Sequence, residues 1–326
     1  MVFAGRASDR SWNSTKQDSD ARWPHQWLPG ALCFLSPKGM ATNRTLAGKT
    51  IFISGGSRGI GLAVALRAAR DGANIAIAAK TSEPHPSLPG TISTAARQIE
   101  EAGGQALPLV CDIREEEQVE AAVAATVARF GGVDICLNNA SAVRLRTILD
   151  TPIKRYDLIN GVNARGTFLV TQKCLPHLLM AENPHVLAIS PPLNMEERWF
   201  APHVAYSVSK FGMSLMMLGV AGEFRGRVAA NTLWPRTAID TAAMAEFKSH
   251  LDIGSLRSPE IMTDAAYLIL TSDAKTMTGN FFVDDEVLAA HGVVDLSRYN
   301  PPGVADIDIT PDLFVPSLLE LSWKRE

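Results

Sequence analysis

Tyr206 and Lys210 are the residues with the clearest chemical potential, a tyrosine and a lysine four positions apart. On a helix, residues at this spacing share one face, so the ammonium of Lys210 would lie beside the phenol of Tyr206. A neighbouring cation stabilises the phenolate and lowers the pKa of a tyrosine from about 10 toward neutrality. The pair therefore predicts a general acid or base, provided that other elements place a substrate beside it.

A glycine-rich turn lies about 150 residues upstream of this pair. Residues 50–54 are an apolar run typical of a strand, residues 55–61 read Gly-Gly-Ser-Arg-Gly-Ile-Gly, and a helix-forming segment follows to residue 72. In nucleotide folds the glycines allow close backbone approach, and the helix N-terminus faces the pyrophosphate. The alternative is a glycine-rich connection in an ordinary α/β domain. The flanking strand and helix favour nucleotide binding.

Strand-like and helical segments alternate from residue 49 onward. This alternation predicts an α/β fold, a single Rossmann-type doubly wound parallel sheet with about seven strands and helices on both faces. We expect strands at 50–54, 74–79, 106–110, 133–137, 185–190, 227–233 and 280–284. We expect helices at 59–71, 91–102, 115–130, 152–180 with a break at Gly161, 203–225 and 259–271.

The two ends of the chain differ from this central domain, which we expect to span residues 46–290. Residues 1–45 contain three tryptophans and show no helix or strand periodicity. We expect a disordered or non-native extension, with translation beginning at Met40, and an organised N-terminal cap is the alternative. Residues 291–326 are expected to form an irregular extension that could pack on a neighbouring molecule.

Composition excludes several classes of partner. The net charge of −3, without a dense basic run, gives no electrostatic case for nucleic acid or an anionic membrane. No apolar stretch approaches the ~20 residues of a membrane span. The four cysteines lack the spacing of a metal site, and buried reduced thiols are expected at Cys111 and Cys136. We therefore expect no bound metal, no membrane span and a cytoplasmic location.

Four motifs occur in a characteristic order: the glycine turn, residues 138–141, Asn163 within residues 160–166, and the Tyr206/Lys210 pair. Together they make residues 46–290 resemble the short-chain dehydrogenase/reductase family. A closer resemblance to one group within that family is found at residues 79–81, 85–86, 88–91, 189–194 and 234–239. Members of that group often carry a C-terminal sterol-carrier domain, and we expect none in a chain of this length.

The resemblance implies a set of cofactor-binding residues: Ser54, Gly55, Ser57, Arg58, Gly59, Ile60, Gly61, Lys80, Asp112, Ile113, Asn139, Ala140, Lys210, Pro235 and Thr237. In this set the glycines would form the pyrophosphate turn, Asp112 would contact the adenine ring, and Asn139 and Ala140 would lie beside the ribose. Two alternatives stay open. Asp112 could cap a helix, and Asn138 and Asn139 could be turn formers.

The resemblance also implies the catalytic residues. Tyr206 would exchange the proton, Lys210 would bind the nicotinamide ribose, and Asn163 would hold a helix and a relay water. The family usually has a serine 13 residues before its tyrosine, a position that Leu193 occupies here. Either Ser190 takes the role of that serine, or another group such as Asn194 holds the substrate oxygen.

Two cations bear on the choice of cofactor. NAD-preferring nucleotide folds place an acid after the second strand, but here that strand ends in Lys80, and Arg58 lies within the glycine turn. Both cations could pair with a 2′-phosphate. Lys80 alone could be a solvated strand end. Together with Arg58 it favours NADP(H).

The predicted function is hydride transfer between NADP(H) and a carbonyl or secondary alcohol. An apolar substrate, such as a steroid, a fatty-acyl compound or an aromatic carbonyl, is suggested by Met195, Trp199, Phe200, Trp234 and Met244, although ordinary packing would also explain them. An NADP(H)-binding sensor or scaffold with little turnover is the alternative function.

Two further expectations concern Arg236 and the helix that begins near Tyr206. Arg236 would contact an anionic substrate or the cofactor, or else point to solvent. The helix is apolar nearly all round, so it would be buried in the core or against a partner. Because the family commonly pairs this helix across a two-fold axis, we expect a homodimer or homotetramer.

Overall fold

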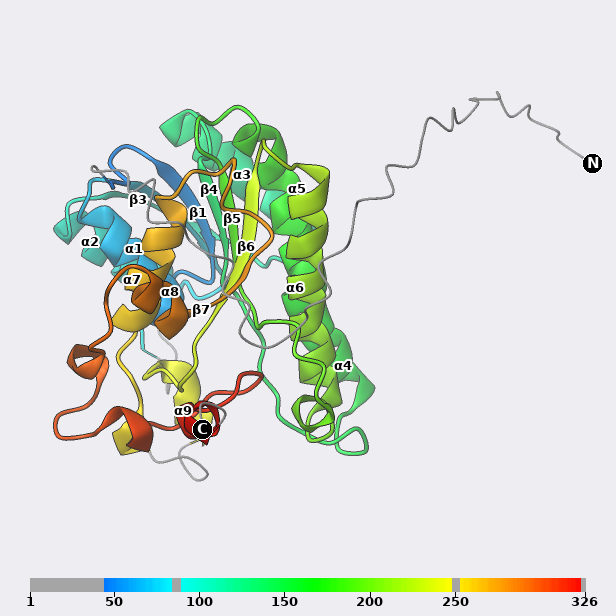
Figure 1. Ribbon diagram of the computed structural model, residues 1–326. Helices are drawn as coiled ribbons and strands as arrows, with labels where there is room; N and C mark the ends of the chain where they lie inside the picture. The colour runs from blue at the N-terminus through cyan, green and yellow to red at the C-terminus, as the bar shows by residue number, and fades with distance from the viewer. Residues whose placement is uncertain (1–43, 84–88, 248–252, 324–326) are drawn as a thin grey trace, which may run out of the picture. The chain divides into compact units, whose positions relative to one another are not determined.

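A seven-stranded parallel sheet forms the centre of the computed structural model, which describes residues 44–83, 89–247 and 253–323 (Figure 1). The strand order is β3-β2-β1-β4-β5-β6-β7, and each neighbouring pair is parallel. The doubly wound fold predicted from the sequence is therefore confirmed. The strands are β1 (Thr50–Ser54), β2 (Asn74–Ala79), β3 (Gln105–Val110), β4 (Ile135–Asn138), β5 (His185–Ile189), β6 (Ala229–Trp234) and β7 (Phe281–Val283).

Helices cover both faces of the sheet (Figure 1). Ile51 and Ile53 of β1 pack into one core with α1, α2 and α7, whereas Phe52 packs into the other with α3, α5 and α6. Central strands are apolar on both sides because both faces are buried. The helices are α1 (Gly59–Ala69), α2 (Ile92–Glu101), α3 (Glu116–Phe130), α4 (Ile153–Asn160), α5 (Thr167–Leu178), α6 (Val204–Glu223), α7 (Glu260–Leu270), α8 (Asp284–Ala290) and α9 (Leu318–Trp323).

The expected break at Gly161 is a π-helical segment, η1 (Gly161–Gly166), which joins α4 to α5. Single π-helical turns inside α-helices occur often at functional sites, because they shift the side chains that follow. Here the π-helical segment carries Asn163 into the interior, where it is fully buried. Helices α8 and α9 were not predicted from the sequence.

Helix α6 corrects the expectation about apolar segments. Its 20 residues are long and apolar enough to cross a membrane by length and composition alone. However, 56% of its apolar window is buried, and the buried residues include the polar Ser209 and Lys210. We therefore interpret α6 as a core helix, packed against β6.

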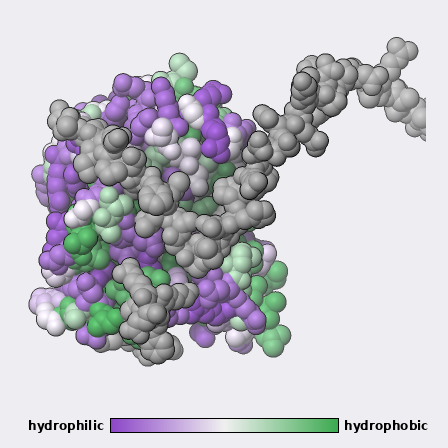
Figure 2. Space-filling model, in the orientation of Figure 1, coloured by the Kyte–Doolittle hydropathy of each residue, from purple (hydrophilic) through white to green (hydrophobic). Residues whose placement is uncertain are grey.

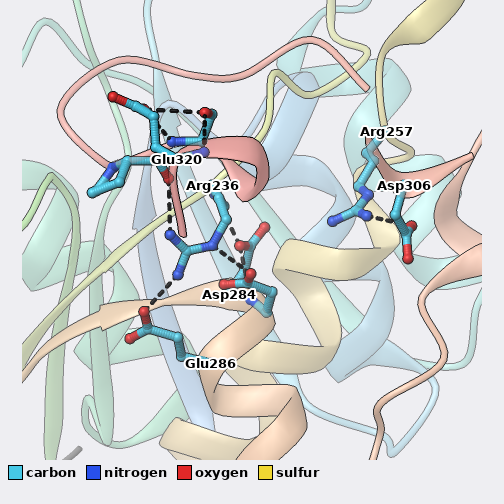
Figure 3. Close-up of polar contacts among 9 residues, drawn as sticks. Arg236, Arg257, Asp284, Glu286, Asp306 and Glu320 are labelled. Carbon is cyan, nitrogen blue, oxygen red and sulfur yellow. Dashed lines mark hydrogen bonds and ion pairs between the residues drawn. The ribbon is translucent and has the colours of Figure 1, made fainter. Parts of the chain in front are cut away.

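The segment after α8 is tied to the domain by two buried arginines (Figure 3). Arg236 forms ion pairs with Asp285 and Glu286 at the start of α8, and its Nη1 donates to the carbonyl of Pro316 at 3.0 Å. Arg257 pairs with Asp306 at 2.6 Å. Arg236 therefore does not point to solvent, and its charge is already neutralised by carboxylates, so an anionic substrate or cofactor is not its partner here.

Arg236→Leu should destabilise the fold by about 3–5 kcal/mol, since it removes the cation from a buried group of carboxylates while keeping an apolar side chain of moderate size. Arg298→Leu is the matched control, because the side chain of Arg298 is 61% exposed in its pair with Asp264 and its loss should cost less than about 1 kcal/mol. Chemical denaturation at neutral pH measures both. Equal losses in the free energy of unfolding would show that the buried ion pairs of Arg236 stabilise the fold no more than the exposed pair of Arg298.

Candidate active site

The residues predicted to be functional converge at the carboxyl ends of the strands, around the point where the strand order reverses between β1 and β4. In open α/β sheets this reversal leaves a crevice in which ligands bind. The glycine turn follows β1, Asn139 and Ala140 follow β4, and Ser190 follows β5. Pro235 and Thr237 follow β6.

The glycine turn lies directly against the loop after β4. A Cβ on Gly55, whose φ is +73°, would lie 2.8 Å from the Cα of Ala140, and a Cβ on Gly61 would lie 2.5 Å from Nδ2 of Asn139. Nδ2 of Asn139 donates to the carbonyl of Gly55 at 2.9 Å. No other residue type fits at these two glycines without moving the loop.

The start of α1 fits a pyrophosphate. The helix begins at Gly59, and no side chain of the described residues caps its first turn. The first backbone N–H groups of a helix have no partner within the helix, so they are donors for an anionic ligand, and the helix dipole favours negative charge there. Together with the glycine turn, these N–H groups form an anion-binding cradle at the start of α1, a helix of 11 residues.

Several predicted cofactor residues have a structural role in this cradle. Oγ of Ser54 accepts hydrogen bonds from the backbone N–H groups of Asn139 and Ala140 at 3.2 and 3.3 Å, so it joins β1 to the loop after β4. Ser57 is buried in the turn, and Ile60 is partly exposed. Ile113 is buried against η1, where a Cβ on Gly166 would lie 2.6 Å from its Cδ1.

Both predicted cations lie at the end of β2. Nη2 of Arg58 donates to Oγ1 of Thr81 at 2.9 Å, and Nζ of Lys80 lies 3.5 Å from the carboxylate of Asp112. Asp112 also pairs with Arg114 at 2.5 Å, and chiefly this hydrogen bond lowers its pKa to about 2. Asp112 is therefore ionised, and it does not cap α3, whose N-cap residue is Glu115. Lys80 remains 59% exposed, which leaves its ammonium open to a phosphate.

Tyr206 and Lys210 are buried together, but their electrostatics differ from the expectation. Only 5% of Tyr206 and 2% of Lys210 is exposed. Burial and the carboxylate of Asp312 raise the pKa of Tyr206 above its ordinary value, although a side-chain contact with Ser141 lowers it. Burial lowers the pKa of Lys210 to about 7, and its Nζ donates to the carbonyl of Ile189 at 2.6 Å. The expected lowering of the tyrosine pKa is therefore wrong for this state of the site.

Asn163 links the loop after β4 to the catalytic helix. Its Oδ1 accepts from the N–H of Ala142 at 2.7 Å, and its Nδ2 donates to the carbonyl of Ala142 at 3.0 Å and to Oγ of Ser209 at 2.9 Å. Ser141, next to Ala142, contacts Tyr206. Asn163 thus fixes the loop that carries Ser141 relative to α6, the helix that carries Tyr206.

Three buried hydroxyls have no hydrogen-bond partner among the described residues: Oγ1 of Thr232 within β6, and, beyond the ends of strands, Oγ of Ser190 and Oγ1 of Thr237. Unpaired buried polar groups cost free energy, so native sites usually supply them with a ligand or water. The places of Ser190 and Thr237 after β5 and β6 suit a polar group of a nicotinamide or a substrate oxygen. Asn194, the other candidate for the substrate oxygen, bonds within its own loop, to the N–H of Glu196 at 3.1 Å.

Two residues close to Tyr206 were missed by the sequence interpretation, Asp312 and Phe314. The carboxylate of Asp312 acts on both Tyr206 and Lys210, and burial raises its own pKa to about 6. Phe314 is fully buried, and its ring centroid lies 6.0 Å from that of Tyr206. No spacing or motif marks these residues, because they lie more than 100 positions after Tyr206 in an irregular segment.

Residues 49–252 match the family model of short chain dehydrogenases, and the chain belongs to the short-chain dehydrogenase/reductase family of oxidoreductases. It is 52% identical, over 83% of its length, to hydroxysteroid dehydrogenase-like protein 2 of Danio rerio. This match confirms the resemblance to one group of the family. The chain spans 64% of the length of that relative.

Solved structures agree with this assignment. A protein from Xanthomonas campestris shares 56% identity with a TM-score of 0.80, and the match covers 84% of this chain and 100% of the other. A short-chain dehydrogenase from Mycobacterium thermoresistibile shares 51% identity with a TM-score of 0.79, covering 84% and 97% respectively. The fold and the family are therefore shown by both sequence and structure.

Asp312→Asn should move the acidic limb of the pH profile for alcohol oxidation to lower pH. Ionised Asp312 raises the pKa of Tyr206, so the neutral amide lets the phenol lose its proton at lower pH, and its Oδ1 can still accept from the N–H of Leu313. On that limb kcat/KM should rise by up to about tenfold, the effect of one pKa unit. Asp308→Asn, the same change at an exposed position, is the control. An identical limb in both variants would contradict the assignment.

Proposed function

We propose that the protein is an NADP(H)-dependent oxidoreductase that transfers a hydride between the nicotinamide and a carbonyl or secondary alcohol carbon of an apolar substrate. The observation that supports this most is the position of Tyr206 and Lys210 one turn apart on α6, at the carboxyl ends of the strands and near the anion cradle at α1. When bound, the nicotinamide supplies or accepts the hydride. The residues described here would bind the cofactor, orient the substrate and exchange the proton.

In this mechanism Tyr206 protonates the oxygen of the reduced carbonyl, or removes the hydroxyl proton in the opposite direction. A low-dielectric site strengthens the effect of each nearby charge, so the neighbouring ammonium of Lys210 counts for more than it would in water. Lys210 would bind the nicotinamide ribose, and Asn163 with a bound water would complete the proton path. The unpaired hydroxyl of Ser190 is our candidate for the group that holds the substrate oxygen.

The preference for NADP(H) is supported by the charges at the end of β2. Arg58 and Lys80 approach this point from the glycine turn and the strand, with the hydroxyl of Thr81 beside them. A 2′-phosphate would gain charge-assisted hydrogen bonds from both side chains. An unphosphorylated ribose would leave both cations without that partner.

An apolar substrate is supported by the aromatic side chains around Tyr206. Trp199 and Trp234 are buried near the tyrosine, and Phe200 packs against Phe211 at 4.8 Å between ring centroids. Met195, which the sequence suggested for the same pocket, is 72% exposed. The aromatic side chains would therefore select among a steroid, a fatty-acyl compound and an aromatic carbonyl as substrate.

A cofactor-binding sensor or scaffold is the second candidate. The near-complete burial of Tyr206 favours it, because a catalytic phenol must touch its substrate. The family's tyrosine, lysine and asparagine are all present, which favours the enzyme.

We further propose a homodimer or homotetramer in the cytoplasm. Leu215 and Leu218 of α6 are 56% and 40% exposed, and Phe168 of α5 is 54% exposed. Hydrophobic surface also gathers at the lower right of Figure 2, where Figure 1 places α4. Exposed apolar side chains on neighbouring helices are typical of a subunit interface.

Exchange of both Arg58 and Lys80 for methionine should raise the KM for NADPH by at least roughly 100-fold and change the KM for NADH little. Hydrogen bonds to charged groups contribute about 1.5–3 kcal/mol each, and only the phosphorylated cofactor would make them here. Arg67→Met is the control, since Arg67 lies on α1 but pairs with Asp71 away from the turn. Equal losses with both cofactors would refute the assignment of the phosphate site.

Tyr206→Phe tests the function itself. It removes the exchangeable proton and keeps the ring, so turnover of ketones with NADPH should fall at least about 100-fold, the usual contribution of a general acid. Thermal stabilisation by NADPH should persist. Wild-type turnover in the variant would exclude the mechanism. Stabilisation of the wild type by NADPH, without consumption on ketones, aldehydes or acyl thioesters, would favour the binding protein.

A further inference from the structure

Phe314 occupies the place where the sequence predicts the substrate pocket. Two of the aromatic residues suggested for an apolar substrate lie on its two sides, Trp199 before α6 and Trp234 at the end of β6. The ring of Phe314 touches both sides, with centroid distances of 6.3 Å to Trp199, 5.9 Å to His203 and 5.7 Å to Trp234. Tyr206 and Phe211 complete the surroundings of a ring that is fully buried.

The segment that carries this ring, residues 310–316, is fixed along the end of β6, and we call it the C-terminal strap. The N–H of Ala238 donates to the carbonyl of Thr310 at 2.8 Å, and the N–H of Asp312 donates to the carbonyl of Arg236 at 3.0 Å. Nε1 of Trp234 donates to the carbonyl of Leu313 at 2.8 Å. The strap is therefore part of the wall of the site, held by bonds to residues that alternate along the chain with Pro235 and Thr237, the predicted cofactor residues.

The backbone at Phe314 is strained. Its φ of +72° is the only positive φ of a non-glycine residue in the described part of the chain. Bulky side chains rarely adopt this region, at a cost of order 1–3 kcal/mol, and such strain persists where the surrounding structure imposes it, often at functional sites. The strap turns the ring inward toward Tyr206 at this cost.

We propose that Phe314 is a specificity-determining residue. Its ring fills the pocket beside Tyr206 and restricts substrates to those whose carbonyl carbon bears a slim, open-chain group, excluding carbonyls joined directly to an aryl or fused ring. This inference rests on the proposed function and narrows its substrate class. A planar ring next to the carbonyl would require the space that Phe314 already occupies.

Phe314→Gly tests the proposal, because glycine adopts the positive φ without strain and leaves a ring-sized apolar cavity. With NADPH, the wild type should prefer a straight-chain 2-alkanone to acetophenone. The variant should shift the ratio of the two kcat/KM values toward acetophenone by at least about tenfold, within the range that pocket volume gives. Thermal stabilisation by acetophenone in the presence of NADPH should also be larger in the variant, and this measurement needs no turnover.

Two further variants make the test specific. Leu296→Ala removes buried apolar volume from a position outside the strap, so it should leave both measurements at wild-type values. Phe314→Leu should shift them in the same direction by less, and it serves if the glycine variant does not fold. Stabilisation by acetophenone without turnover of either ketone would refute the proposed function alone. Turnover with an unchanged ratio and unchanged stabilisation would refute the role of Phe314 alone.

Discussion

The contact between the glycine turn and the loop after β4 is the constraint on which the site depends. At Gly55 and Gly61 the backbone of the turn approaches Asn139 and Ala140 so closely that a Cβ has no room. The loop therefore has one position relative to the cradle at α1. The same loop continues to Ser141, which contacts Tyr206, and to Ala142, which Asn163 ties to α6. The glycine turn at the start of α1 and the phenol of Tyr206 are thus placed by one continuous set of contacts.

The charges around Tyr206 act against one another. Burial disfavours both the phenolate and the ammonium, and it raises the pKa of Tyr206 while lowering that of Lys210 to about 7. Asp312 favours the charged lysine but opposes the phenolate. A carboxylate that is supplied by a distant segment therefore sets part of the proton affinity of the site. The position of the strap therefore affects the pKa values of Tyr206 and Lys210 as well as the shape of the site.

The sheet, the order of elements and the shared helix of Tyr206 and Lys210 could be predicted because they depend on local patterns. Apolar strands with flanking helices give the fold, and a lysine four residues after a tyrosine gives a shared helix face. The residues that surround this pair and Arg236 could not be predicted. Arg236 was expected at a ligand or in solvent, but its partners are carboxylates of α8 about 50 residues later, which no periodicity connects to it. Asp312 and Phe314 were missed for the same reason, since irregular segments have no repeating pattern that fixes the direction of a side chain.

Arg236 explains how a strained residue can persist beside Tyr206. Its backbone N–H and carbonyl bond Asp284 and Asp312, and its guanidinium binds α8 and the carbonyl of Pro316 (Figure 3). These bonds hold the strap on both sides of Phe314, so its left-handed backbone is held in place by two hydrogen bonds to Arg236. A free cation at this position would have left the strap untied. Arg236 is therefore best understood as the anchor of the strap that forms a wall of the site beside Tyr206.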